Sequence, residues 1–93
     1  MKIRLIIIIL LLFSEMVAAK TYCVAKSGND KNTGESSSPF LTIQKGAEMA
    51  QPGDTVFVRE GIYRERVSPS RGGSAGFPIV YMGEQNKNVI IKG

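Results

Sequence analysis

The chain of 93 residues contains no histidine and a single cysteine. Without histidine, these residues can form neither a Ser-His nucleophile pair nor a histidine-based metal site. The lone Cys23 excludes an internal disulfide, and we predict that it is a small buried residue in the first strand. The sequence also lacks a phosphate-binding loop, a nucleic-acid motif and coiled-coil heptads, so we expect no nucleic-acid partner.

The longest hydrophobic run lies at the N-terminus. The basic residues Lys2 and Arg4 are followed by nine consecutive apolar residues, 5–13, and by small residues that end at Ala19. This pattern is typical of a secretory signal peptide, and the run is shorter than the about 20 apolar residues that span a bilayer. We therefore predict a signal peptide over residues 1–19, cleaved after about Ala19. The protein is expected to be secreted, periplasmic or on the cell surface, with no membrane association after cleavage.

The charge of the mature chain is small. Removal of residues 1–19 takes away two basic residues and one acidic residue, which lowers the net charge from +4 to +3. A mildly basic surface would suit an acidic glycan, but so small a charge is also ordinary for a domain with neutral partners. Charge alone therefore does not identify the ligand.

A short helix is predicted after Thr42. The threonine is a typical helix cap, and Ile43, Ala47 and Ala50 recur at helical spacing, so the helix has one narrow apolar stripe. Gly46 costs roughly 1 kcal/mol relative to alanine inside a helix, and its presence there indicates a close backbone approach. The stripe is suited to covering the first layer of a stacked structure.

Turn residues and strands follow the helix. Pro52 ends it, and Gly53 and Asp54 supply turn chemistry. Residues 55–58, TVFV, are predicted to form a strand with two apolar faces, as in strands that are stacked and covered. We predict further strands at residues 21–25, 79–82 and 89–91, and a second turn at Glu60-Gly61.

Five segments occur in a fixed order along residues 22–93. They are YCVAKSGNDKNTG (22–34), PFLTIQ (39–44), PGDTVFV (52–58), EGIYRERV (60–67) and VIIKG (89–93). Together they resemble the N-terminal cap and first coil of secreted right-handed parallel β-helix proteins that act on polysaccharides. The resemblance implies a mainly β fold over residues 20–93, the N-terminal part of a pectate-lyase-like solenoid with a short capping α-helix.

The continuation RERVSPSRGG, residues 64–73, looks most like the start of β-xylosidase-type enzymes of glycoside hydrolase family 120. Similar openings occur in β-helix pectate, alginate and chondroitin lyases, and in β-helix domains with no assigned activity. Three function classes therefore stay open: a hydrolase of β-xylosidase type, which we favour, a polysaccharide lyase, and a non-catalytic capping or glycan-binding β-helix. The implied partner is a polysaccharide or oligosaccharide. No cofactor is expected in this chain, and calcium is implied only if the parent protein is a lyase.

The length of the chain limits what it can do alone. A solenoid needs about three or more repeats and a cap, and this sequence holds about one and a half coils. We therefore expect the N-terminal piece of a larger protein, with the catalytic residues on later coils. An isolated fragment is expected to be poorly soluble or only partly folded, because an open coil exposes apolar residues and unpaired strand groups.

The carboxylates give no complete catalytic pair. Glycoside hydrolysis needs two of them across the scissile bond, but Asp54 lies in a turn where aspartate commonly bonds the backbone. Glu60 and Glu65 are expected to be solvated or ion-paired with nearby arginines. Asp30 and Asn32 superficially suggest calcium, yet the EF-hand spacing is not met and a tight turn is the better interpretation. We assign no catalytic and no metal-binding residue.

A basic edge is the one candidate for substrate binding. Arginine binds carboxylates in a bidentate manner and a tyrosine ring stacks on sugars. The candidates are Tyr63, Arg64, Arg66 and Arg71. The alternative is a solvated face whose arginines form surface ion pairs with Glu60 and Glu65.

Overall fold

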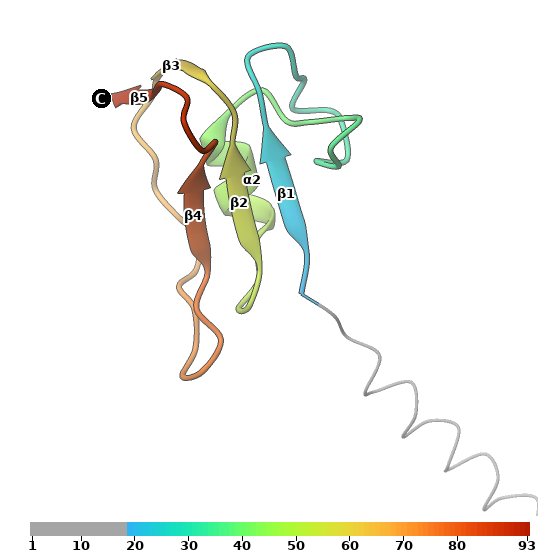
Figure 1. Cartoon of the computed structure of the whole chain (residues 1–93). Helices are drawn as coiled ribbons and strands as arrows, with labels where there is room; N and C mark the ends of the chain where they lie inside the picture. The colour runs from blue at the N-terminus through green and yellow to red at the C-terminus, as the bar shows by residue number, and fades with distance from the viewer. Residues whose placement is uncertain (1–18) are drawn as a thin grey trace, which may run out of the picture.

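The computed structural model describes residues 19–93 (Figure 1). The predicted signal peptide therefore lies outside the described residues, apart from Ala19. Within the described part, no helix is both long enough and apolar enough to cross a bilayer. The elements in chain order are β1 (Thr21–Val24), α2 (Ile43–Met49), β2 (Thr55–Val58), β3 (Gly61–Arg64), β4 (Val80–Gly83) and β5 (Val89–Lys92).

All strand pairs between these elements are parallel. One sheet has the order β1-β2-β4, and a second pairs β3 with β5. The register places Thr21 beside Thr55 and Thr55 beside Val80. After each coil, the chain therefore pairs with the corresponding strand of the coil before it. This stacking is the pattern of a parallel β-helix, as the sequence predicted.

Strand β3 was not predicted. We expected only a turn at Glu60-Gly61, but β3 begins at Gly61 and pairs with β5. Gly61 has a φ of 152°, a conformation that side chains disfavour, and its amide donates to the carbonyl of Asn88 at 3.0 Å. Gly61 is thus both the residue at which the chain turns after β2 and the first residue of β3.

The helix covers the inner face of the first two strands. Thr42 caps it by accepting from the Lys45 amide at 3.2 Å, and the predicted stripe of Ile43, Ala47 and Ala50 is buried. Figure 1 shows α2 behind β1 and β2, where it packs against both. The core cluster contains Tyr22, Val24, Phe40, Ile43, Ala50, Val56, Val58 and Tyr63.

The loop before the helix covers the outer edge of β1. The Cys23 amide donates to the carbonyl of Gly34 at 2.7 Å, and the Phe40 amide donates to the carbonyl of Cys23 at 2.9 Å. The Ala25 amide then donates to the carbonyl of Phe40 at 2.9 Å. Cys23 is buried as predicted. These bonds occupy an edge that would otherwise be free to pair with another chain.

The opposite end of the stack is open. Tyr22, Val56 and Tyr81 lie side by side in register, and their exposed fractions are 9%, 0% and 41%. In the second sheet, Tyr63 is 1% exposed whereas its partner Ile91 is 54% exposed. The core is therefore closed at the helix and uncovered at β4 and β5.

We predict that Gly46→Ala destabilises the fold by about 1–2 kcal/mol. A β-carbon at this position would lie 2.9 Å from Cγ1 of Val56, a stiff and fully buried side chain, so overpacking outweighs the better helix propensity of alanine. Urea unfolding followed by circular dichroism would measure the change.

Gly72→Ala is the matched control, because a β-carbon there meets nothing within 4 Å. Val56→Ala should largely remove the cost of Gly46→Ala, since the two positions are in contact. An equal cost of Gly46→Ala in both backgrounds would contradict the proposed clash.

Candidate functional site

Tyr63 is not available to stack on a sugar. Its side chain is 1% exposed, its hydroxyl donates to the carbonyl of Arg59 at 2.8 Å, and the Lys26 ammonium lies 4.9 Å from its ring centroid. Burial, together with the negative charge of Glu65, raises the pKa of Tyr63 above its usual value. The ring belongs to the core, because the alternation of β3 points it inward.

Arg71 is held by the end of the helix. Its Nη1 donates to the carbonyl of Glu48 at 2.9 Å and to the carbonyl of Ala50 at 2.8 Å. Such bonds satisfy carbonyl groups that have no partner within the helix. The structure thus gives Arg71 a capping role that the sequence did not predict.

Arg64, Arg66 and Arg71 are all exposed, but among residues 19–93 only Arg71 of these three uses its side chain in a hydrogen bond. Arg64 and Arg66 lie on the side of the chain opposite Tyr63, because residues two apart in an extended strand share one face. The neighbouring Arg59 uses its Nη2 to donate to the carbonyl and the hydroxyl of Ser36, both at 2.9 Å. The candidate glycan contact is therefore reduced to Arg64 and Arg66.

Glu65 lies at the start of the helix. Its Oε2 accepts from the amide of Ile43 and its Oε1 from the amide of Gln44, both at 3.0 Å. The sequence predicted a solvated or ion-paired side chain and missed this contact. The signal was present in the alternation: Glu65 is two residues after Tyr63 and shares its inward direction.

Asp30 holds the loop against the same end of the helix. Its Oδ1 accepts from the amides of Leu41 and Thr42 at 2.8 and 2.9 Å, and its Oδ2 accepts from the Thr42 hydroxyl at 2.7 Å. Nearby, Asn29 closes a tight turn by accepting from the amide of Lys31 at 2.8 Å. Glu65 and the Thr42 cap thus satisfy the first three amides of α2, and Asp30 satisfies the two amides just before the helix.

The loop does not fit calcium. Both carboxylate oxygens of Asp30 already accept protein hydrogen bonds, and the Asn32 amide group donates to the carbonyl of Pro39 at 2.9 Å. Among residues 19–93, no three His, Cys, Asp or Glu side chains come together as a metal site. Calcium needs six to eight oxygen ligands, and this loop uses its carboxylate to order the backbone.

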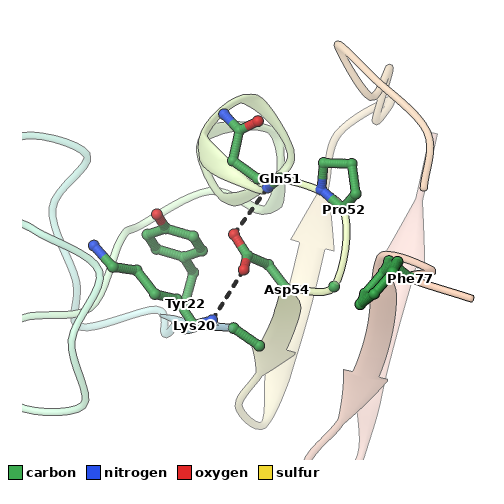
Figure 2. A pocket seen from close by; sticks show the side chains of 8 residues that line it. Lys20, Tyr22, Gln51, Pro52, Asp54 and Phe77 are labelled. Carbon is green, nitrogen blue, oxygen red and sulfur yellow. Dashed lines mark hydrogen bonds between the residues drawn. The ribbon is translucent and has the colours of Figure 1, made fainter. Parts of the chain in front are cut away.

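Asp54 lies beside a shallow pocket of about 350 Å³ (Figure 2). Its carboxylate is 5% exposed, with Oδ1 accepting from the Lys20 amide and Oδ2 from the Gln51 amide, both at 2.9 Å. Gly53, with a φ of 93°, makes the turn that precedes it. The pocket is lined by Ala19, Lys20, Tyr22, Gln51, Pro52, Gly53, Asp54 and Phe77.

Three of the carboxylates have a structural role. Asp30, Asp54 and Glu65 each accept at least two hydrogen bonds, and each takes backbone amides from a segment distant in sequence or from an adjoining turn. A general acid or nucleophile must face a substrate across a cleft. These three side chains face the protein backbone, so they join the helix, the loop and the first strands.

Residues 26–86 match the model of a family described as a protein of unknown function, DUF1565. The uncharacterized protein YwoF of Bacillus subtilis is 39% identical over 75% of this chain, and pectate lyase PEL9 of Emericella nidulans is 31% identical over 88% of it. The chain spans 15% and 20% of the lengths of these two relatives.

Solved structures show the same fold. A complex of XylC with xylose is 44% identical over 74% of this chain and 11% of its own, with a TM-score of 0.72. A rhamnogalacturonan lyase is 30% identical over 78% of this chain and 22% of its own, with a TM-score of 0.66. A GH136 lacto-N-biosidase from Eubacterium ramulus, 22% identical over 70% of this chain and 12% of its own, has a TM-score of 0.58 and shows the fold alone. These findings confirm the predicted fold, the N-terminal part of a right-handed parallel β-helix with a capping helix.

We predict that stability falls with acid through Asp30. Burial raises its pKa, but hydrogen bonds from the hydroxyl and amide of Thr42 and from the amide of Leu41, with the charge of Lys45, together lower it below 3.8. A depressed pKa contributes stability that is fully present above the unfolded value of about 3.9 and is lost as the pH falls through the folded value. The unfolding free energy should therefore drop below about pH 4.

Asp30→Asn is the test variant for this acid effect. It should be less stable than the parent protein at pH 7, and the difference should shrink as the pH falls below about 4. Urea unfolding at a series of pH values measures both proteins. A difference that stays constant from pH 7 to pH 3 would show that the Asp30 charge has no part in holding the loop.

Proposed function

This chain belongs to the DUF1565 family, and we propose that residues 20–93 are the N-terminal cap and first coils of a secreted β-helix protein that acts on polysaccharides. The observation that carries the proposal is the asymmetry of the stack, which is closed by α2 at one end and open at β4 and β5. A cap is required at the end of a solenoid, and further coils fit its open face. The basic and hydrophobic N-terminus supports secretion with cleavage after Ala19.

For the whole protein, a glycoside hydrolase of β-xylosidase type is our first proposal. The supporting observation is the 44% identity to XylC, whose structure was solved with xylose. The second candidate is a polysaccharide lyase, supported by the similarity to a pectate lyase and a rhamnogalacturonan lyase. A calcium cofactor is proposed only if the protein is a lyase. In either case we place the reacting groups on later coils, and this placement is supported by the engagement of Asp30, Asp54 and Glu65 with the backbone.

The product of the complete gene would be assayed on xylo-oligosaccharides, polygalacturonate and rhamnogalacturonan. Hydrolysis releases new reducing ends without an unsaturated sugar, whereas elimination leaves an unsaturated uronate that absorbs in the ultraviolet. We expect reducing xylose from xylo-oligosaccharides and no unsaturated product. Binding without cleavage would support a non-catalytic β-helix, and the absence of both binding and cleavage on all three substrates would contradict a role on these glycans.

We predict that Arg64 and Arg66 contribute to the binding of carboxylate-bearing sugars. Replacing both by alanine should weaken binding to oligogalacturonate roughly fivefold, because exposed charge pairs are individually weak but two act together. Isothermal titration at low and at moderate salt would measure the affinity, and the difference between variant and parent should shrink with salt.

The control removes the same charge elsewhere. Lys31 and Lys87 are exposed and lie outside β3 and β5, and replacing both by alanine lowers the net charge by the same amount. An equal loss of affinity in both double variants would show that binding depends on the net charge and not on the positions of Arg64 and Arg66. An unchanged affinity after loss of Arg64 and Arg66 would leave them as a solvated face.

A further inference from the structure

The amide nitrogen of Lys20 lies against a buried carboxylate. It donates to Oδ1 of Asp54 at 2.9 Å, and Asp54 is 5% exposed (Figure 2). The other carboxylate oxygen accepts from the amide of Gln51 at 2.9 Å. A buried ionised carboxylate is costly unless it is well paired, and both of these donors are neutral backbone amides.

The position of this nitrogen is set by the sheet. The carbonyl of Lys20 accepts from the Thr55 amide at 2.9 Å, and the next residue, Thr21, pairs in register with Thr55 at the start of β1 and β2. The backbone of Lys20 is therefore fixed on both sides of its α-carbon. Its nitrogen stays beside Asp54 through contacts that involve only residues from Lys20 onward.

The same nitrogen is the atom that signal-peptide cleavage would release. Hydrolysis of the Ala19-Lys20 peptide bond by water gives the signal peptide a carboxylate at Ala19 and gives the mature chain an amine at Lys20. An α-amine has a pKa of about 7.7–8.0, so that it takes up a proton near neutral pH. A neutral amide donor would thereby become an ammonium group.

We infer that Asp54 is the receptor for the mature N-terminus, and that cleavage after Ala19 converts the hydrogen bond from Lys20 into an ion pair that strengthens the cap. The inference rests on the secretion that is part of the proposed function. A hydrogen bond with one ionised partner is already stronger than a neutral one, and a charged donor adds the attraction between opposite charges, which is large where water is excluded. The ammonium also neutralises a carboxylate that holds the start of β1 to the turn after α2. The precursor is consequently the less stable form of the fold.

The test is a double-mutant cycle on the secreted protein. The product of the complete gene is expressed with its own residues 1–19. A second form carries one serine inserted between Ala19 and Lys20, so that the mature protein begins one residue earlier. Each form is made with Asp54 and with Asp54→Asn. The insertion should lower the ratio of folded to unfolded protein about fivefold in the Asp54 background and leave it unchanged in the Asn background. An equal effect in both backgrounds would overturn the inference.

A second readout does not depend on the stability of the variants. The mature N-terminus is identified by mass spectrometry, and the α-amine is labelled near neutral pH, with the exposed lysine side chains as the internal reference. We expect Lys20 to be the first residue and its α-amine to react at least tenfold more slowly than in urea. A different first residue, or labelling at the rate of the unfolded chain, would overturn the inference. The polysaccharide assays on the same preparation report separately on the proposed activity.

Discussion

The packing of α2 on the inner face of β1 and β2 is the contact on which the rest of the structure depends. The first strands of a parallel β-helix have apolar side chains on their inner face and no preceding coil to cover them. Gly46 lets the helix backbone approach Val56 more closely than any other residue would, while Ile43 and Ala47 complete the contact. When α2 has packed against β1 and β2, the free edge of β2 is held in place and β4 can pair with it in register.

Three acidic side chains connect α2 and its flanking residues to neighbouring segments of the chain. Asp30 binds the preceding loop to its start, Glu65 binds the end of β3 to its first amides, and Asp54 binds the following turn to the beginning of β1. A short helix is marginal by itself, and charged acceptors on its free amides compensate in part. The acidic residues that were considered for catalysis or for calcium binding are therefore needed for the architecture.

The sequence predicted local structure well and long-range contacts poorly. The cap at Thr42, the stripe of α2 and four of the five strands follow from spacing and turn residues. Strand β3 was missed because Gly61 was interpreted only as a turn. That omission concealed the inward direction of Tyr63 and Glu65, since alternation cannot be applied to a strand that is not recognised. The contact of Arg71 with the end of α2 was missed for a different reason: the carbonyls that it binds lie more than twenty residues earlier in the chain.

The alternation along β3 also separates the parts of this chain that can vary from those that cannot. Tyr63 and Glu65 point inward and are committed to the core and the helix, so replacing either leaves a cavity or unpaired amides. Arg64 and Arg66 point outward and carry no contact that the fold requires. Because the interior of the solenoid is filled by packed side chains, any ligand of this part of the protein would bind on its outer surface. Outward positions can therefore change while the inward positions keep the cap closed, in keeping with a shared fold between this chain and structures as different as XylC and a rhamnogalacturonan lyase.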